Sequence, residues 1–166
     1  MQQPPSPGAR PGRNGDSSPG ACFVTICTQD RKCSLSHIAV GEGLAPPEAR
    51  VTVIGKCVEE QIHALSRRYP SVTIDKHVIM PNHIHLIVTI REDPGGASPS
   101  PTLYDVVRVL KSLTTRLSRK HLGDSPLWQR SYYEHGIRGE ADYRKIWEYI
   151  DNNPAKWAED RYFAEE

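Results

Sequence analysis

His77-Val-Ile-Met-Pro-Asn-His-Ile-His-Leu-Ile-Val-Thr-Ile90 is the stretch that decides the predicted fold. From His83 onward it reads as a β-strand, in which residues i and i+2 point to the same face. His83 and His85 therefore share one face, and apolar side chains share the other, namely Ile84, Leu86, Val88 and Ile90. The apolar face indicates a core beneath the strand. The face with the two histidines has no evident core to pack against, so the presence of the histidines needs another explanation.

Two histidines one residue apart on a strand suit a metal ion. At about 3.3 Å per residue their backbones lie roughly 7 Å apart, so two neutral imidazoles can converge on one divalent cation. The same pattern also occurs as two polar residues on a solvated face, or as a core pair with local hydrogen bonds. The pair alone does not decide between these alternatives.

The sequence on both sides of this stretch predicts further strands and helices. Residues 71–80 and 83–90 should form a hairpin around the tight turn Pro81-Asn82. Residues 29–47 and 92–101 are polar connections rich in Pro and Gly. The other predicted elements are strands at 21–28 and 132–138 and helices at 48–67, 102–121 and 141–152. This β-α-β-β-α-β-α order predicts an α+β, ferredoxin-like fold, an antiparallel sheet with packed helices.

Each predicted helix carries an apolar stripe at spacings of three and four residues, which should face the core. The stripes are Val51, Ile54, Val58, Ile62 and Leu65 in the first helix, Leu103, Val106, Val107, Leu110, Leu113 and Leu117 in the second, and Tyr143, Ile146, Trp147 and Ile150 in the third.

Length and composition indicate one domain. The chain has 166 residues, enough for one core. Residues 1–20 are rich in Pro and Gly and are expected to form a disordered tail. The domain is expected at 21–157, followed by a C-terminal tail at 158–166. No signal peptide, membrane-spanning run or zinc-type cysteine spacing is found, so we expect a cytoplasmic protein with reduced cysteines.

Local charge says more than the net charge of +1. The second predicted helix carries Arg108, Lys111, Arg116 and Arg119 with one acid, and Arg138 belongs to a later basic cluster. A solvated helix face would explain these cations, and so would contact with the phosphate backbone of a nucleic acid.

Tyr149 lies at the margin of the third helix stripe, and Asn153 would lie on the same side if the helix continues to it. Pro154 leaves that continuation open, because a residue before proline tends to leave the helical region. Tyr149 could be an ordinary boundary residue. A tyrosine oxygen can also act as a nucleophile, but with a pKa near 10 it needs activation.

A metal ion at His83 and His85 would supply that activation by polarising a phosphodiester. An amide oxygen from Asn153 would suit Mg²⁺ or Mn²⁺, with the histidines favouring Mn²⁺ somewhat. A two-histidine site without thiolates is less typical of structural zinc.

These motifs together resemble the single-tyrosine HUH transposases, most closely the REP-associated tyrosine transposases of bacteria. The resemblance covers roughly residues 21–157. It rests on the following segments: Phe23–Thr28, Met80-Pro-Asn-His-Ile-His85, Leu110–Ser112, Trp128-Gln129, Glu134–Arg138 and Tyr149-Ile-Asp-Asn-Asn-Pro154. Relatives from insertion sequences tend to carry Gln at the position of Asn153, so the asparagine favours the REP-associated branch.

The resemblance implies the HUH endonuclease fold and a specific chemistry. Tyr149 would attack a phosphate of single-stranded DNA, leaving a covalent 5′-phosphotyrosine and a free 3′-hydroxyl, and the reversal of this step would join strands. His83, His85 and Asn153 would hold Mg²⁺ or Mn²⁺. Lys111 and the other basic residues would hold the DNA backbone. Glu134 and His135 fit the pattern without an assigned role.

The expected partner is single-stranded DNA, a hairpin with a short flanking motif, bound by a bacterial protein of the cytoplasm and nucleoid. A homodimer stays open, because insertion-sequence relatives donate the tyrosine helix in trans, whereas REP-associated relatives can act as monomers. Two other functions remain: a catalytically silent hairpin-binding protein derived from a transposase, and a metal phosphohydrolase that uses water. The absence of an acidic cluster for two metals argues against the second of these.

Overall fold

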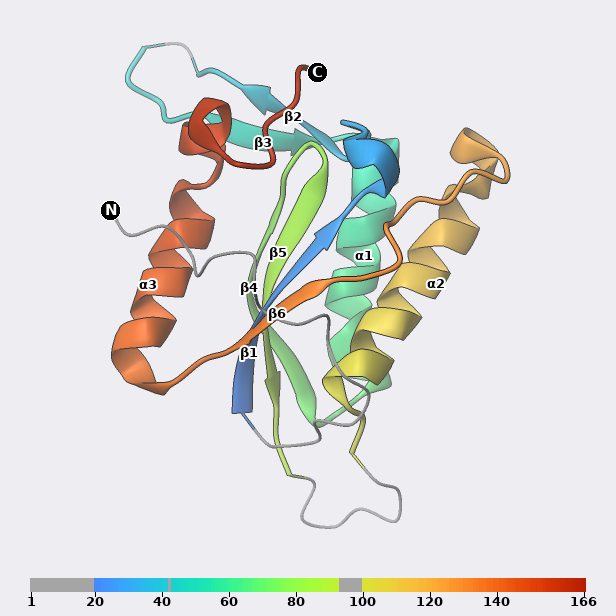
Figure 1. Cartoon of the computed structure of the whole chain (residues 1–166), viewed down its shortest axis with the longest axis vertical. Coiled ribbons are helices and arrows are strands. Elements are labelled where there is room, and N and C mark those ends of the chain that lie inside the picture. Colours follow the sequence, from blue (N-terminus) through green and yellow to red (C-terminus); the bar gives the residue numbers. More distant parts are fainter. Residues whose placement is uncertain (1–19, 42, 93–99) are drawn as a thin grey trace.

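An antiparallel sheet with helices on both faces forms the centre of the molecule (Figure 1). The computed structural model describes residues 20–41, 43–92 and 100–166. The sheet has the order β4-β5-β1-β6, and every neighbouring pair is antiparallel. Its strands are β1 (Gly20–Cys27), β4 (Val72–Ile79), β5 (His83–Ile90) and β6 (Tyr133–Gly136). This order confirms the predicted ferredoxin-like α+β fold.

The helices divide between the two faces of the sheet (Figure 1). Helices α1 (Val53–Arg68) and α2 (Leu103–Leu122) lie side by side on one face, and α3 (Gly139–Asn152) covers the other. In the described residues no helix has the length and apolar character needed to cross a membrane. The tail predicted at 1–20 lies outside the described residues, except for Gly20, which begins β1.

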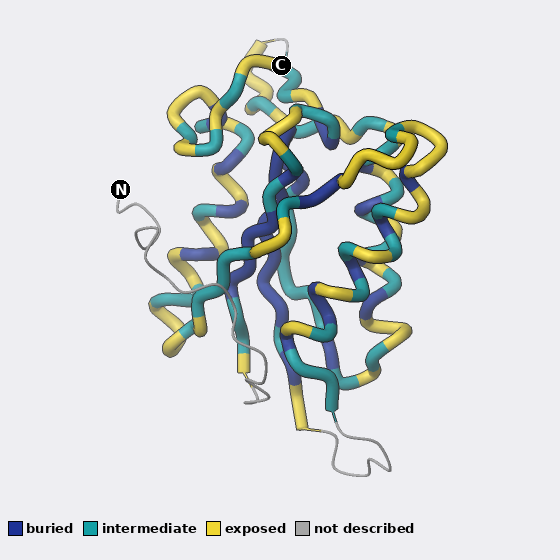
Figure 2. Tube along the Cα trace, turned by 45° about the vertical axis from the view of Figure 1, so that its right-hand side comes forward, coloured by how far each residue is buried: buried dark blue, intermediate teal, exposed yellow. Residues whose placement is uncertain are grey.

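Two apolar cores result, one on each face of the sheet. The larger fills the space between the sheet, α1 and α2, and the smaller is built around Phe23, Ile87, Ile146 and Ile150 under α3. The central strands are therefore buried on both faces, as the dark tube at the centre of Figure 2 shows. The expectation that the histidine face of β5 has no core was wrong, because α3 and the residues that follow it cover that face.

The polar connection predicted at 29–47 holds more structure than expected. It contains the short 3-10 helix η1 (Gln29–Arg31) and strand β2 (Ser36–Ala39), which pairs with β3 (Glu48–Val51). The predicted first helix consequently begins five residues later, at Val53. Thr52 caps it by accepting a hydrogen bond from Gly55 N, and Val51 pairs with Ser36 and is 37% exposed. The spacing of apolar residues in a helix does not show that Val51 pairs with a strand on the other side of a loop.

The stripes of the other helices are partly confirmed. In α2 the predicted residues up to Leu110 are buried, but Leu117 is 40% exposed and Leu113 is half-buried. Thr114 and Ser118 are buried instead, and Thr114 Oγ1 accepts a hydrogen bond of 2.8 Å from the indole of Trp128. The segment around Trp128 docks on this part of the helix, so a polar residue faces inward there.

A bulge in β4 anchors α3. The register of β4 against β5 shifts between Ile74 and Lys76, and this irregularity lets Asp75 and Lys76 both contact α3. Asp75 Oδ2 accepts a hydrogen bond of 2.8 Å from the hydroxyl of Tyr143, and Lys76 Nζ lies 2.8 Å from Asp151 and 4.8 Å from the ring centre of Trp147. Trp147, predicted to be buried, covers Lys76 at the surface and is 37% exposed.

The chain ends close to the start of β5. After α3 comes the 3-10 helix η2 (Pro154–Glu159), and the last residues run back toward β2 (Figure 1). There Glu166 accepts a hydrogen bond from Ile38 N. Residues 158–166, set apart as a tail in the sequence, thus lie against the folded domain.

Candidate active site and nucleic-acid interface

His83 and His85 lie at the start of β5, directly after the Pro81-Asn82 turn. They pair across β1 with Cys27 and Thr25, and their side chains face α3. Both are buried, with 0% and 1% of their surfaces exposed. Burial lowers the pKa of His83 to about 3 and the pKa of His85 well below its ordinary value. Both imidazoles are therefore neutral at pH 7, the form that binds metal.

Neighbouring side chains fix the orientation of both rings. His83 Nδ1 lies 2.8 Å from Asn82 Oδ1, and His85 Nδ1 lies 2.8 Å from Thr25 Oγ1. The amide nitrogen of Asn82 already donates to the Tyr162 carbonyl at 2.7 Å, so its Oδ1 must accept from His83 Nδ1. The neutral His83 ring then carries its lone pair on Nε2, which lies 3.1 Å from His85 Nε2. Two nitrogens bound to one metal at right angles are about 3 Å apart, so this geometry fits a shared ion.

Tyr149 and Asn153 of the α3 segment face the histidine pair. The ring centre of Tyr149 lies 5.3 Å from that of His85 and 6.0 Å from that of Phe23. Asn153 is the residue after α3 and keeps helical angles (φ −59°, ψ −44°), so it stays on the same side as Tyr149 despite Pro154. The structure thus answers the question that the sequence left open.

The amide oxygen of Asn153 is placed where it could serve as a metal ligand. Asn153 is 2% exposed, and its Oδ1 has no hydrogen-bond partner of normal distance and angle among the described residues. A buried polar atom without a partner costs about 1–3 kcal/mol. A cation beside His83 and His85 would satisfy it, so the donor set fits Mg²⁺ or Mn²⁺.

The C-terminal segment adds two residues to the site that sequence reasoning missed. Asp160 Oδ2 lies 4.0 Å from His83 Nε2 and accepts a hydrogen bond of 3.2 Å from Asn153 Nδ2. His83, His85 and Asp160 form one of two groups, within the described residues, that can hold a metal ion. The ring of Tyr162 lies 4.6 Å from that of His83 and covers it. No spacing or motif in residues 158–166 marks this role.

In this arrangement the hydroxyl of Tyr149 is held in its protonated form. Burial is the main cause of its raised pKa, and the negative charge of Asp160 adds to it. Burial also raises the pKa of Asp160. Tyr162 and Asp160 therefore close the site and disfavour the phenolate at the same time.

The predicted basic residues of α2 separate into two groups. Arg116 and Arg119, together with Arg130, border a shallow groove between α2 and residues 126–130. Lys111 also lines the groove, but its ammonium donates to the carbonyls of Gln129 (2.6 Å) and Arg130 (3.0 Å) and thereby holds the groove wall. Burial lowers the pKa of Lys111.

Arg108 and Arg138 do not line this groove. Arg108 is exposed near the beginning of α2, and Arg138 precedes α3. Arg138 is eleven residues from Tyr149, which corresponds to about 16 Å along a helix.

A short backbone path connects the groove with the histidine pair. Thr28 forms a bridge with Trp128 in the wall of the groove. Its backbone nitrogen and its hydroxyl both donate to the carbonyl of Asn82, at 2.9 and 3.0 Å. Asn82 in turn holds His83. The basic groove and the histidine pair therefore lie on neighbouring parts of one rigid framework.

His135 makes a contact between β6 and α3. Its Nε2 lies 3.0 Å from Asp142 Oδ2, and the same carboxylate accepts from Arg138 N. This contact joins β6 to the first turn of α3. Glu134 pairs with Val24 of β1.

The family model described as "Transposase IS200 like" matches residues 45–153 of the chain. This span contains His83, His85, Tyr149 and Asn153. The chain belongs to the IS200-like transposase family. The resemblance expected from the sequence is therefore confirmed.

Individual relatives agree with this membership. An uncharacterised protein of Haemophilus influenzae is 33% identical over 163 residues, covering 89% of this chain and 87% of its own length. A second protein of that species, provisionally named a REP-associated tyrosine transposase, is 30% identical over 99 residues, covering 53% of this chain and 52% of its own length. The solved structure of a REP-associated tyrosine transposase bound to a REP hairpin matches with a TM-score of 0.63 and 25% identity, covering 87% of this chain and 72% of that chain.

Proposed function

We propose that this IS200-like transposase nicks single-stranded DNA beside a hairpin and transfers the strand through a covalent bond to Tyr149. The observation that carries the proposal is the position of Tyr149 and Asn153, which face His83 and His85 of the same chain. A tyrosine, two neutral imidazoles and an unsatisfied amide oxygen are the groups that a metal-assisted attack on a phosphodiester requires.

The proposed reaction exchanges one phosphoester bond for another, so it needs no external energy source. The Tyr149 hydroxyl loses its proton to solvent, and its oxygen attacks the phosphorus. The bond between phosphorus and the 3′ oxygen breaks, and that oxygen takes up a proton and leaves as a 3′-hydroxyl. The 5′-phosphate stays on Tyr149, so a second 3′-hydroxyl can attack it and restore a phosphodiester.

His83, His85 and Asn153 would hold the metal ion, with Mn²⁺ or Mg²⁺ suited to this mixed nitrogen and oxygen set. When bound, the ion would withdraw charge from the phosphate oxygens. Asn82 and Thr25 hold the two rings by their Nδ1 atoms and leave the Nε2 atoms for the ion.

Substrate entry requires the C-terminal segment to move. Tyr162 covers the fully buried histidines, and Asp160 occupies the space beside His83. Displacement of these residues would expose the ligands and remove a negative charge that disfavours the Tyr149 phenolate.

The DNA strand is expected to lie along the groove bordered by Arg116, Arg119 and Arg130. Arginine side chains suit phosphate contacts, and the structural relative is bound to a hairpin. Arg108 and Arg138 would contact DNA only at the periphery of such a path, and Lys111 would act mainly on the groove wall. Tyr149 faces the histidines of its own chain, so we expect it to act in cis, and a homodimer stays a prediction.

The proposal is tested with labelled hairpin oligonucleotides from the DNA around the protein's own gene, with Mn²⁺ or Mg²⁺, on a denaturing gel. We expect a covalent protein–DNA band that disappears with EDTA and in Tyr149→Phe. The matched control is Tyr104→Phe, because Tyr104 is an exposed tyrosine of α2.

Cleavage that survives Tyr149→Phe would contradict the proposal and indicate water as the nucleophile. Hairpin binding without cleavage under all metal conditions would favour a catalytically silent DNA-binding protein. The observation that favours a catalytically silent protein is the closed site, in which Tyr162 covers His83 and Tyr149 is protonated.

A further inference from the structure

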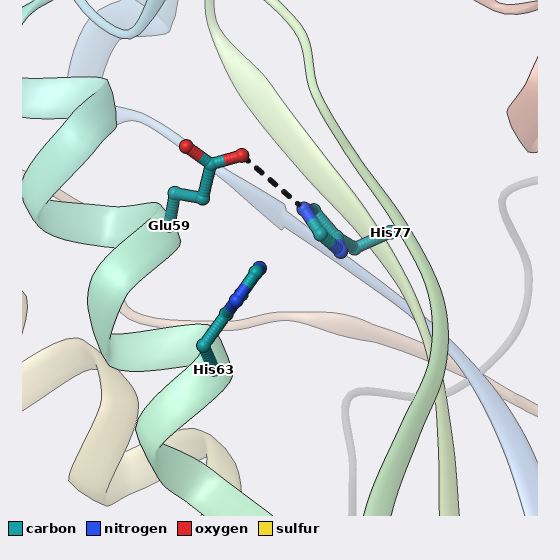
Figure 3. Close-up of side chains that lie close together, drawn as sticks. All are labelled: Glu59, His63 and His77. Carbon is teal, nitrogen blue, oxygen red and sulfur yellow. Dashed lines mark ion pairs between the residues drawn. The ribbon is translucent and has the colours of Figure 1, made fainter.

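A second cluster of histidine and carboxylate side chains lies between α1 and β4, on the face of the sheet opposite His83 and His85. Glu59 and His63 are four residues apart on α1, and His77 comes from β4 (Figure 3). Figure 3 shows the carboxylate and both rings directed toward one common space. One ligand atom from each residue lies within 4.8 Å of the others.

The geometry of the cluster is set by the helix and the strand. Positions i and i+4 of a helix share a face, so Glu59 and His63 project together. His77 pairs with Leu86 of β5, whose side chain belongs to the core under α1, so His77 projects toward the same helix. His77 Nε2 lies 3.8 Å from Glu59 Oε1, and the two imidazole ring centres lie 5.4 Å apart at an interplanar angle of 75°.

An ion pair does not account for this cluster at neutral pH. His77 would have to be protonated to pair with Glu59, but burial, with a contribution from His63, lowers its pKa. A neutral imidazole nitrogen and a carboxylate oxygen lying 3.8 Å apart are beyond normal hydrogen-bond distance, and both can bind one cation placed between them.

We propose that Glu59, His63 and His77 bind one divalent transition-metal ion of the Zn²⁺ type, with a coordination position left open to water. Two imidazoles and one carboxylate are a ligand set for such ions, whereas Mg²⁺ prefers oxygen ligands and keeps its own water. His63 is exposed and Glu59 is 41% exposed, so an ion can enter from solvent.

The site would add a further link between α1 and the edge of the main sheet. β4 is an edge strand with a single neighbour, β5, in that sheet. An ion held jointly by α1 and β4 binds only the folded chain and therefore stabilises it. The inference is independent of Tyr149 and of nicking, because the cluster lies on the face opposite the histidine pair.

The test is a calorimetric titration of the full chain with Zn²⁺ in the presence of excess Mg²⁺, together with thermal unfolding. We expect His63→Ala and Glu59→Gln to bind one equivalent of Zn²⁺ fewer than the wild type, or to bind that equivalent at least tenfold more weakly. Zn²⁺ should raise the Tm of the wild type by several degrees and that of His63→Ala by clearly less. His121→Ala, which removes another exposed helical histidine, is the matched control and should behave as the wild type.

The histidine pair under α3 is the same in the wild type and in these variants. A loss of one bound Zn²⁺ in the variants therefore reports on the Glu59, His63 and His77 site alone. Equal Zn²⁺ stoichiometry and affinity in the wild type, His63→Ala and Glu59→Gln would overturn the proposal. A Zn²⁺ effect that His121→Ala abolishes and His63→Ala retains would also overturn it.

Discussion

The sheet carries a histidine cluster on each face, and the two clusters differ in burial and in origin. His83 and His85 come from one strand, are 0% and 1% exposed, and lie beneath Tyr162. His63 and His77 come from a helix and a strand, and His63 is open to solvent. Both clusters add a carboxylate, Asp160 in the first and Glu59 in the second.

The difference in burial suggests that the two clusters differ in what controls access of an ion. The buried pair has fixed ring orientations and an amide oxygen nearby, and under the proposed function metal and DNA would reach it only after the C-terminal segment moves. The open cluster has no such cover, so availability of the ion decides its occupancy. A buried cluster is suited to chemistry on a bound strand, and an open one to binding an ion that tightens the fold.

The largest expected effect comes from removing a ligand of the buried pair. His85→Ala should lower formation of the covalent product by at least about a hundredfold and destabilise the fold by on the order of 2–4 kcal/mol, because a cavity replaces a buried ring. Gel assays and urea unfolding measure the two effects, with His121→Ala as the control for both. Normal nicking by His85→Ala would mean that the buried pair holds no catalytic metal.

The next largest effect is expected from acid, which should weaken the fold through the buried pair. An unfolded histidine has a pKa near 6.5, whereas in the folded chain the pKa of His83 is about 3 and that of His85 is lower than its ordinary value. The unfolded state therefore binds more protons below pH 6.5. Stability from this source is complete above about pH 7 and falls by up to about 1.4 kcal/mol per histidine for each pH unit below 6.

Urea unfolding at pH 7, 6 and 5 measures this loss. His85→Gln should reduce the slope of stability against pH by about one histidine's share. A stability that does not change between pH 7 and 5 would show that the two rings become protonated without unfolding.

A smaller effect is expected from the cover over the pair. Tyr162→Ala removes the ring that lies 4.6 Å from His83, so metal and DNA should enter more easily and the covalent product should form roughly 3–10-fold faster. Phe163→Ala is the matched control, because that ring packs on Trp157 and is 44% exposed. Slower product formation in Tyr162→Ala would instead assign the ring a positive role in the reaction.

The smallest effect concerns the anchor between β4 and α3. Tyr143→Phe removes one hydrogen bond to Asp75, which keeps two others from Thr73 and Thr89. The free energy of unfolding should fall by about 0.5–1.5 kcal/mol. Urea unfolding measures this loss, with Tyr104→Phe as the control variant. A loss above about 3 kcal/mol would mean that this bond holds the whole tyrosine helix in place.

Local pattern predicted most of the sheet and the helices. Alternation in β5 and apolar spacing in α1 and α2 reflect direct contacts with the core, so Ile84, Val58 and Leu110 are buried as expected. The errors occur where distant segments meet. Val51 belongs to a strand because it pairs with Ser36, and Thr114 faces inward because Trp128 lies against it.

The sequence by itself placed His83 and His85 on one face of a strand, and its motifs singled out Tyr149 and Asn153 as candidates. The structure decided that Asn153 keeps helical angles before Pro154 and so lies on the side of Tyr149. Only the tertiary structure decided that α3 and Tyr162 bury the histidine pair, that Asp160 joins it, and that His77 meets Glu59 and His63. These contacts connect segments far apart in the chain. Their positions depend on how helices pack on both faces of the sheet, which no short-range periodicity encodes.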